Sequence, residues 1–256
     1  MAPERAVAIV KELERTLLQF IRTHQIDHDD YRQATDLVIA SIKAGEESLL
    51  FDVFFEAEAT DVGGAQRSGS TNAIEGPFYL PGAPVLIHPC VLPQRPDERG
   101  DLLTFRGTVR TCDGTALAGA ELDVWHADAD GLYSGIHPGL PDWNLRGRFT
   151  TGPDGSFTLT TRVPPPYEIP KNGPTGTVLN ALGRHFYRPA HLHVKVRAAG
   201  HQDLTSQLYF QGGEFLDSDV ANAVRDGLVV ELRRDGGQQL AEYDFVLDAA
   251  RSAVPA

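Results

Sequence analysis

Two histidines lie two positions apart in the segment HLHVKV, at His191 and His193. Successive side chains of a β-strand point to opposite faces, so these two imidazoles would share one face of a strand. Leu192, Val194 and Val196 would share the other face, which can be buried in a core. Adjacent imidazoles could bind one metal ion, although in an arbitrary sequence two hydrogen-bonded histidines are the more common meaning of this spacing.

A metal ion held by two histidines needs further ligands. Carboxylates are the usual ones, and Asp123, Asp128 and Asp130 are candidates, although Asp in the stretch ADADG is also ordinary turn chemistry. Tyrosine is the alternative, from Tyr133 in GLYSG or Tyr167 in PPPYEIP. A free phenol has a pKa of about 10 and binds metals poorly at neutral pH, but a trivalent ion favours its phenolate. The residue types alone leave both ligand sets open.

Composition narrows the classes of function. The 256 residues include 23 Lys and Arg and 35 Asp and Glu, a formal net charge of −12, which disfavours nucleic acid and anionic membranes as partners. We expect no signal peptide, and no apolar stretch approaches the ~20 residues that span a bilayer. Cys90 and Cys112 form no CxxC motif, so we expect a reduced, cytoplasmic protein whose metals bind N and O ligands.

The first 60 residues have helical periodicity. Pro3 suits a first helical turn, and apolar residues then recur every three or four positions. Asp29 or Asp30 could cap a second helix that ends at Gly45, and LLFDVFFEAEATDV predicts a third. Short amphipathic helices cannot bury their apolar stripes alone, so they must pack on the rest of the chain or on a second subunit.

From about residue 100 the pattern changes to short strands separated by Gly, Pro and Asp turns, such as TGPDGSFTLTTRV. This predicts a mostly β fold: an antiparallel β-sandwich core with an N-terminal α-helical region. The proline-rich stretch VPPPYEIPKNGPTG cannot be a central strand, so we expect an extended loop there. We place the boundary between a helical region, 1–75, and a β-sandwich catalytic domain, 76–256.

Several segments together resemble the intradiol ring-cleavage dioxygenases, the catechol and chlorocatechol 1,2-dioxygenases. They are GLYSG, PYEIPKNGPTG, LGRHFYRPAHLHVKV, LTSQLYF and IEGPFYLPGAP, and with the helical N-terminus the resemblance covers nearly the whole chain. The resemblance implies a non-haem Fe(III) bound by Tyr133, Tyr167, His191 and His193. It also implies that a catechol and O2 are the substrates and that a cis,cis-muconate is the product.

The resemblance implies roles for further residues. Tyr167 would be the ligand that leaves when catechol binds, and Tyr133 the one that stays. Arg188 would stabilise negative charge on the ring, and Gln207 would hydrogen-bond near the reacting centre. Relatives often have Trp where this chain has Tyr187, which we interpret as a packing residue rather than a ligand.

A substrate slot is also implied by the resemblance. Its residues would be Leu49, Asp52, Val53, Ile74, Gly76, Phe78, Tyr79, Val220 and Ala221. Asp in the LFDVFF position is similar to chlorocatechol- and hydroxyquinol-cleaving members, so we expect a substituted, chlorocatechol-type substrate, with catechol or hydroxyquinol as the alternative. The family further suggests a homodimer joined through the N-terminal helices, with a lipid-like molecule at that interface.

Two other classes of function remain in view. RGTVRTCDGTALAGAELDVW with TGPDGSFTL resembles a generic β-sandwich binding module, which would have no need for two tyrosines and two histidines together. A divalent-metal hydrolase would need a carboxylate general base beside the histidine pair, and none is evident in the sequence.

Overall fold

Two amphipathic helices begin the chain, α1 (Pro3–His24) and α2 (His28–Ala44). Pro3 occupies the first turn of α1, and Gly45 ends α2 in the left-handed conformation with φ of 69°. The cap of α2 is Asp27, so the expected cap at Asp29 or Asp30 is wrong. The Asp27 side chain accepts hydrogen bonds from the backbone N–H groups of residues 29 and 30, and Asp30 bonds back to the Asp27 N–H, which makes a capping box.

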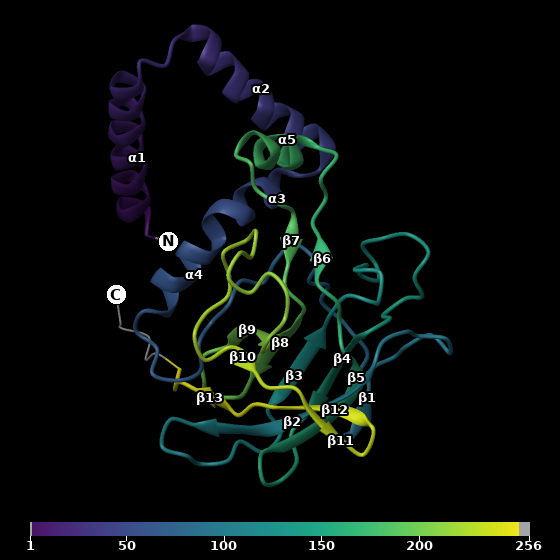
Figure 1. Cartoon of the computed structure of the whole chain (residues 1–256). Coiled ribbons are helices and arrows are strands. Elements are labelled where there is room, and N and C mark those ends of the chain that lie inside the picture. The colour runs from purple at the N-terminus through teal and green to yellow at the C-terminus, as the bar shows by residue number, and fades with distance from the viewer. Residues whose placement is uncertain (1, 251–256) are drawn as a thin grey trace. The chain divides into compact units, whose positions relative to one another are not determined.

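The computed structural model describes residues 2–250, and the chain divides into two compact units (Figure 1). One unit ends at Glu47 and the other begins at Ser48, rather than near residue 75 as expected. The third predicted helix is three successive segments: α3 (Glu47–Phe51), the π-helix η1 (Asp52–Glu56) and α4 (Ala57–Gly64). Leu49, Val53 and Ala57 are buried among residues of the second unit, which explains why this helical stretch belongs with the sandwich.

Strands of the second unit form two larger sheets and a two-stranded ribbon (Figure 1). The six-stranded sheet contains β1 (Cys90–Val91), β5 (Ser156–Arg162), β2 (Leu102–Thr111), β12 (Gln238–Glu242), β11 (Arg233–Asp235) and β13 (Phe245–Leu247). The five-stranded sheet has the order β10 (Val229–Val230), β9 (Leu204–Phe210), β8 (His191–Arg197), β3 (Glu121–Trp125) and β4 (Arg146–Thr150). The ribbon pairs β6 (Tyr167–Glu168) with β7 (Tyr187–Arg188).

Both larger sheets are mixed: their longest strand pairs are antiparallel, as expected for the core, and shorter parallel pairs extend them. The long pairs β2–β5, β3–β8 and β8–β9 are antiparallel. By contrast, β1–β5, β10–β9, β12–β2 and β13–β2 are parallel. Long stretches of chain separate the members of these parallel pairs, so no tight turn constrains them to run in opposite directions.

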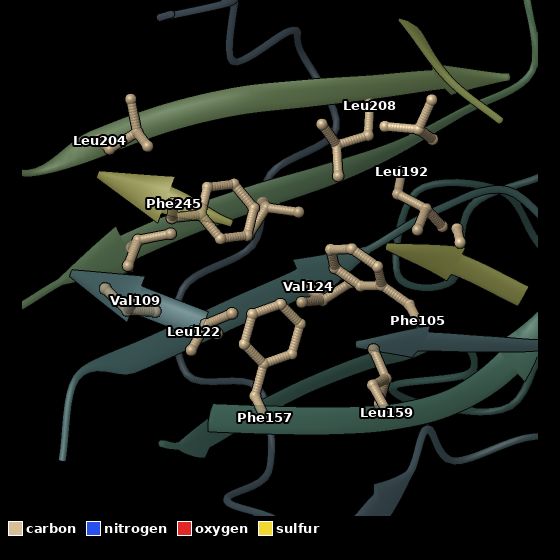
Figure 2. Packing of buried hydrophobic residues seen from close by; sticks show 14 of the residues in the cluster. Phe105, Val109, Leu122, Val124, Phe157, Leu159, Leu192, Leu204, Leu208 and Phe245 are labelled. Carbon is tan, nitrogen blue, oxygen red and sulfur yellow. The ribbon is translucent and has the colours of Figure 1, made fainter. Parts of the chain in front are cut away.

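A continuous apolar core lies between strands of the two larger sheets (Figure 2). Every second side chain of a strand points into this core. Strand β2 contributes Leu103 and Phe105, and β5 contributes Phe157 and Leu159. The rings of Phe105 and Phe157 meet edge to face with centroids 5.1 Å apart. The mostly β sandwich with N-terminal helices that the sequence predicts is therefore confirmed.

The proline-rich stretch is less irregular than expected. It contains β6, and its last three residues begin an unpredicted helix, α5 (Pro174–Ala181), which starts after Gly173 with Pro174 in its first turn. Strand β4 was also not predicted.

Among residues 2–250, no helix is both long enough and apolar enough to cross a membrane.

Candidate metal centre

Strand β8 presents the two histidines as its alternation predicts. Leu192 and Val194 lie in the sandwich core, while His191 and His193 point away from it and are each only 2% exposed. The Nδ1 of His191 lies 2.7 Å from the carbonyl oxygen of Pro189, which makes Nδ1 the protonated nitrogen and leaves a lone pair on Nε2. The two Nε2 atoms are 3.0 Å apart.

A tight loop after β3 presents Tyr133. The Asp128 carboxylate accepts hydrogen bonds from the backbone N–H groups of Asp130 and Leu132 at 2.9 and 3.0 Å, which closes the turn. Gly131 has φ of 78°, and a Cβ there would lie 2.6 Å from the Cβ of Tyr167, so only glycine fits. The Tyr133 side chain is fully buried, and its hydroxyl oxygen lies 3.4 Å from Nε2 of His193.

The second phenol comes from the β6–β7 ribbon. The Tyr167 ring meets the Tyr133 ring edge to face at 5.5 Å and lies 5.7 Å from the His191 ring, both measured between centroids. The neighbouring phenol of Tyr167 adds to the effect of burial in raising the pKa of Tyr133. The ribbon and the loop after β3 thus bring two phenols to the two imidazoles.

These four side chains fit a metal ion that takes N and O ligands. Ligand atoms about 2.1 Å from one ion, at angles of about 90–110°, are about 3.0–3.4 Å apart, which matches the separations at His193. Burial lowers the pKa of His191 to about 3 and that of His193 well below its ordinary value, so both imidazoles are neutral and can donate lone pairs. Burial raises the pKa of Tyr133 and Tyr167, so only a highly charged ion would convert these phenols to phenolates.

The three carboxylates that the sequence offered as alternative metal ligands bind other residues instead. Asp128 closes its turn and pairs with Arg95 at 2.9 Å, and Asp130 pairs with Arg99. Asp123 accepts a hydrogen bond from the Tyr79 hydroxyl at 3.0 Å. Within residues 2–250 no group of three or more His, Cys, Asp or Glu side chains could hold a metal ion, so a metal centre here depends on the tyrosines.

Arg188 and Gln207 lie beside the four candidate ligands. Arg188 is 4% exposed and pairs with Asp219 at 3.0 Å. It also donates to the Gln207 side-chain oxygen at 2.9 Å and to the Tyr209 hydroxyl at 3.0 Å. Burial opposes its charge, but Asp219 and the neighbouring tyrosines hold the pKa of Arg188 well above its ordinary value, so it is a permanent cation.

One contact must adjust if His193 binds a metal. The Gln207 Nε2 donates to the Ile74 carbonyl oxygen at 2.8 Å and also lies 3.3 Å from His193 Nδ1. Ligation through Nε2 leaves the imidazole proton on Nδ1, where it would face an N–H of the amide, so this contact has to lengthen.

A mainly apolar cavity borders the candidate ligands. Its lining residues are Leu49, Asp52, Val53, Glu56, Ile74, Gly76, Pro77, Phe78, Tyr167, Ile169, Arg188, His193 and Ala221. Seven of the nine expected slot residues are among them. The other two are not: Tyr79 turns toward Trp125 and Asp123, and Val220 packs beside a separate surface pocket.

Three lining residues were missed by the sequence analysis: Glu56, Pro77 and Ile169. Glu56 lies four positions after Asp52, and both are in η1. One oxygen of its carboxylate accepts from the backbone N–H groups of Glu75 and Gly76 at 3.0 and 3.4 Å. The other oxygen is buried and has no hydrogen-bond partner in the described part of the chain. Burial and the neighbouring Asp52 raise the pKa of Glu56.

Tyr187, the third tyrosine near the site, does not line the cavity. Its ring stacks on Phe215, with centroids 4.4 Å apart and planes 3° from parallel. This contact agrees with the interpretation of Tyr187 as a packing residue.

Comparison with known proteins places this arrangement in a family. The protein family described as Dioxygenase matches residues 74–249. A chlorocatechol 1,2-dioxygenase of Rhodococcus opacus is 42% identical over 96% of this chain and 99% of that protein. A crystal structure of 3-chlorocatechol 1,2-dioxygenase from Rhodococcus opacus superposes with a TM-score of 0.90 at 42% identity, covering 97% of this chain and 100% of the other.

The chain belongs to the intradiol dioxygenases. This family of ring-cleaving oxidoreductases also includes a catechol 1,2-dioxygenase of Acinetobacter radioresistens, whose structure has a TM-score of 0.87 at 30% identity over 100% of this chain and 89% of the other. Membership confirms the resemblance that the motifs around GLYSG and RPAHLH carry.

Proposed function

We propose that this intradiol dioxygenase is a non-haem ferric enzyme that cleaves a substituted catechol of the chlorocatechol class. O2 would open the ring between its two hydroxylated carbons, giving a cis,cis-muconate. The observation that carries the proposal is the convergence of two phenol oxygens and two imidazole nitrogens beside a buried, mainly apolar cavity. The chlorocatechol 1,2-dioxygenases that are 38–42% identical to this chain support the substrate class.

The ligands would be Tyr133, Tyr167, His191 and His193. These four residues would hold a ferric ion, which when bound would supply a Lewis acid that a catechol can chelate through both of its oxygens, and this would make the ring reactive toward O2. The chain's own residues would accept a proton from the catechol and would orient its ring.

Tyr167 is the phenol that can receive a proton from the substrate. It lines the cavity and is 7% exposed, whereas Tyr133 does not line it and is fully buried. A ring in the cavity therefore reaches the Tyr167 oxygen first. A Tyr167 phenolate that accepts a proton from one catechol hydroxyl becomes a neutral phenol and can leave, while Tyr133 keeps its place.

Arg188 supplies positive charge to the reacting ring. Its guanidinium lines the cavity and is held from three sides by Asp219, Gln207 and Tyr209. A cation fixed in advance stabilises negative charge that develops on the ring without having to reorient. Gln207 does not line the cavity, so its role is to position Arg188, to which its side-chain oxygen is hydrogen-bonded.

The apolar part of the wall excludes water and selects ring substituents. Leu49, Val53, Ile74 and Ala221 are each less than a tenth exposed, and a change of about one methyl group in such a slot shifts substrate preference by about 1–3 kcal/mol.

Hydroxyquinol is a second candidate substrate. The free oxygen of Glu56, with Asp52 one turn away, offers an acceptor to a third ring hydroxyl. A chlorine substituent would leave that oxygen without a partner.

We also propose that the enzyme is a homodimer joined through residues 3–44, with room for a lipid-like molecule there. The apolar side chains of α1 support this, because none of them is buried: Val7, Val10, Leu13, Leu17 and Phe20 are each at least 50% exposed. A stripe of this kind needs an apolar partner.

The decisive experiment measures iron content, visible absorption and ring cleavage on one preparation. We expect one iron per chain, tyrosinate-to-iron absorption in the visible range, and a higher kcat/KM for 3- or 4-chlorocatechol than for catechol or hydroxyquinol. A colourless protein that binds aromatic ligands without consuming O2 would instead be a binding module. A hydroxyquinol preference would favour the second candidate.

A further inference from the structure

Arg146, the first residue of β4, is a second buried arginine at the candidate metal centre. It is 2% exposed, and its guanidinium carbon lies 5.7 Å from the centroid of the Tyr133 ring. Its Nε donates to the backbone and hydroxyl oxygens of Ser134, both at 3.1 Å. Arg146 thus touches both Tyr133 and the residue that follows it.

The positive charges of Arg146 and Arg188 differ in whether an acidic side chain neutralises them. Arg188 has Asp219 as its ion-pair partner. Arg146 has no ion pair with any residue between 2 and 250, and its buried Nη2 has no hydrogen-bond partner there either. The acidic groups whose charge acts on Arg146 are Tyr133 and Asp123, and Asp123 accepts a hydrogen bond from the Tyr79 hydroxyl.

A buried cation without a partner is unfavourable, because it loses water and gains no opposite charge. The phenolate form of Tyr133 would supply that charge across a short distance. Arg188 acts on both Tyr133 and Tyr167, but Asp219 already balances its charge, whereas Arg146 has no such ion-pair partner.

We propose that Arg146 is the fixed counter-charge of the Tyr133 phenolate and thereby makes Tyr133 the phenol that stays on the metal. This inference rests on the proposed function. Arg146 is a positioning residue, since it acts through Tyr133 and does not line the cavity. The charges around the two tyrosines would then set the order in which they act.

The test replaces the charge and follows the metal centre optically. Arg146→Gln keeps a hydrogen-bonding side chain but removes the charge, which raises the energy of electrons on the Tyr133 phenolate. The tyrosinate-to-iron absorption should therefore move to longer wavelength. Loss of iron to a competing chelator should indicate an affinity lower by roughly 10- to 100-fold, the usual effect of losing a residue that supports a ligand.

Two further variants separate charge from structure. Arg146→Lys keeps the charge and should keep the absorption maximum close to that of the parent protein. Arg148→Gln is the matched control: it lies two residues along β4 and bonds to the Ala83 carbonyl oxygen and to Glu121, so it should change neither readout.

The inference is overturned if folded Arg146→Gln keeps the parent absorption and iron affinity, or if Arg146→Lys shifts the band as far as Arg146→Gln does. Either result would leave Arg146 only a structural role at Ser134. If Arg146→Gln does not fold, Arg146→Lys decides, and an unshifted band supports the inference. A parent protein that binds iron without any such absorption would refute the proposed function itself, before any variant is compared.

Discussion

Asp219→Asn tests whether the buried ion pair beside the metal centre holds Arg188 in place. The Asp219 carboxylate accepts from Arg188 Nε and Nη2 at 3.1 and 3.0 Å, and from the backbone N–H groups of Ala221 and Ala223 at 3.2 and 3.0 Å. Asparagine has nearly the same shape but no charge, and one of its two polar ends donates instead of accepting. It would leave Arg188 as a buried cation without a counter-charge.

Breaking a buried pair by removing one partner costs about 3–5 kcal/mol. The side chains of Arg188 and Asp219 are 5% and 2% exposed, so screening by water does not reduce this figure much. We expect Asp219→Asn to lower the free energy of unfolding by about 3 kcal/mol, since the asparagine oxygen still accepts some of the hydrogen bonds. Urea unfolding at pH 7, at fixed iron content, measures it. Asp217→Asn, in the same loop but exposed, is the control and should change stability by less than about 0.5 kcal/mol.

The pH dependence gives a second check on the same pair. Burial alone would raise the pKa of Asp219, but Arg188 and the two backbone N–H groups outweigh it and lower the pKa. A carboxyl whose pKa is lower in the folded state stabilises the protein above its unfolded pKa of about 3.9, and this contribution is lost as the pH falls through the folded value. The difference between Asp219→Asn and the parent should therefore be constant near neutral pH and shrink only below about pH 4. A difference under about 0.5 kcal/mol at pH 7 would refute the reasoning.

Three further predictions concern the metal centre, the slot and the helices. Tyr133→Phe should abolish both the visible absorption and ring cleavage, whereas Tyr187→Phe, which keeps the ring stacked on Phe215 and removes only the hydroxyl, should keep both; bleaching by Tyr187→Phe would contradict the ligand assignment. Glu56→Gln keeps an acceptor for the backbone of residues 75 and 76 but removes the carboxyl, so kcat/KM for hydroxyquinol relative to 4-chlorocatechol should fall about tenfold; an unchanged ratio would show that Glu56 does not contact the substituent. Leu13→Asp places a charge in the exposed stripe of α1 and should convert a dimer to a monomer in sedimentation at micromolar concentration; a parent protein that is already monomeric would refute the dimer.

The sequence predicted the parts of the site that depend on regular periodicity. Alternation along β8 is a local property of the backbone, so it correctly separated His191 and His193 from the core residues between and after them. The mixed sheets could not be predicted in this way, because the pairing of β12 and β13 with β2 depends on contacts between residues more than a hundred positions apart.

Other parts of the slot escaped prediction because irregular backbone changes which side chains share a face. The π-helix η1 alters the register of the helical stretch that contains Asp52 and Glu56, so Glu56 joins the cavity although no motif marks it. Phe78 and Tyr79 are neighbours in a segment without regular structure, and only Phe78 reaches the cavity. The hydrogen bond from Tyr79 to Asp123 explains its orientation, and nothing in the sequence around either residue signals that contact.

The architecture places the candidate metal ligands and most of the cavity wall on different elements. All four candidate ligands come from β8, from the ribbon strand β6 and from the loop after β3, which are held by sheet hydrogen bonds and by the Asp128 turn. Most of the slot wall comes instead from the stretch 49–56 and from residues 74–78. These two stretches are joined by the hydrogen bonds from the backbone of residues 75 and 76 to Glu56. With the proposed function, substitutions in the wall would change which ring substituent is accepted while the ligands stay in place, which is consistent with catechol, chlorocatechol and hydroxyquinol 1,2-dioxygenases having structures similar to that of this chain.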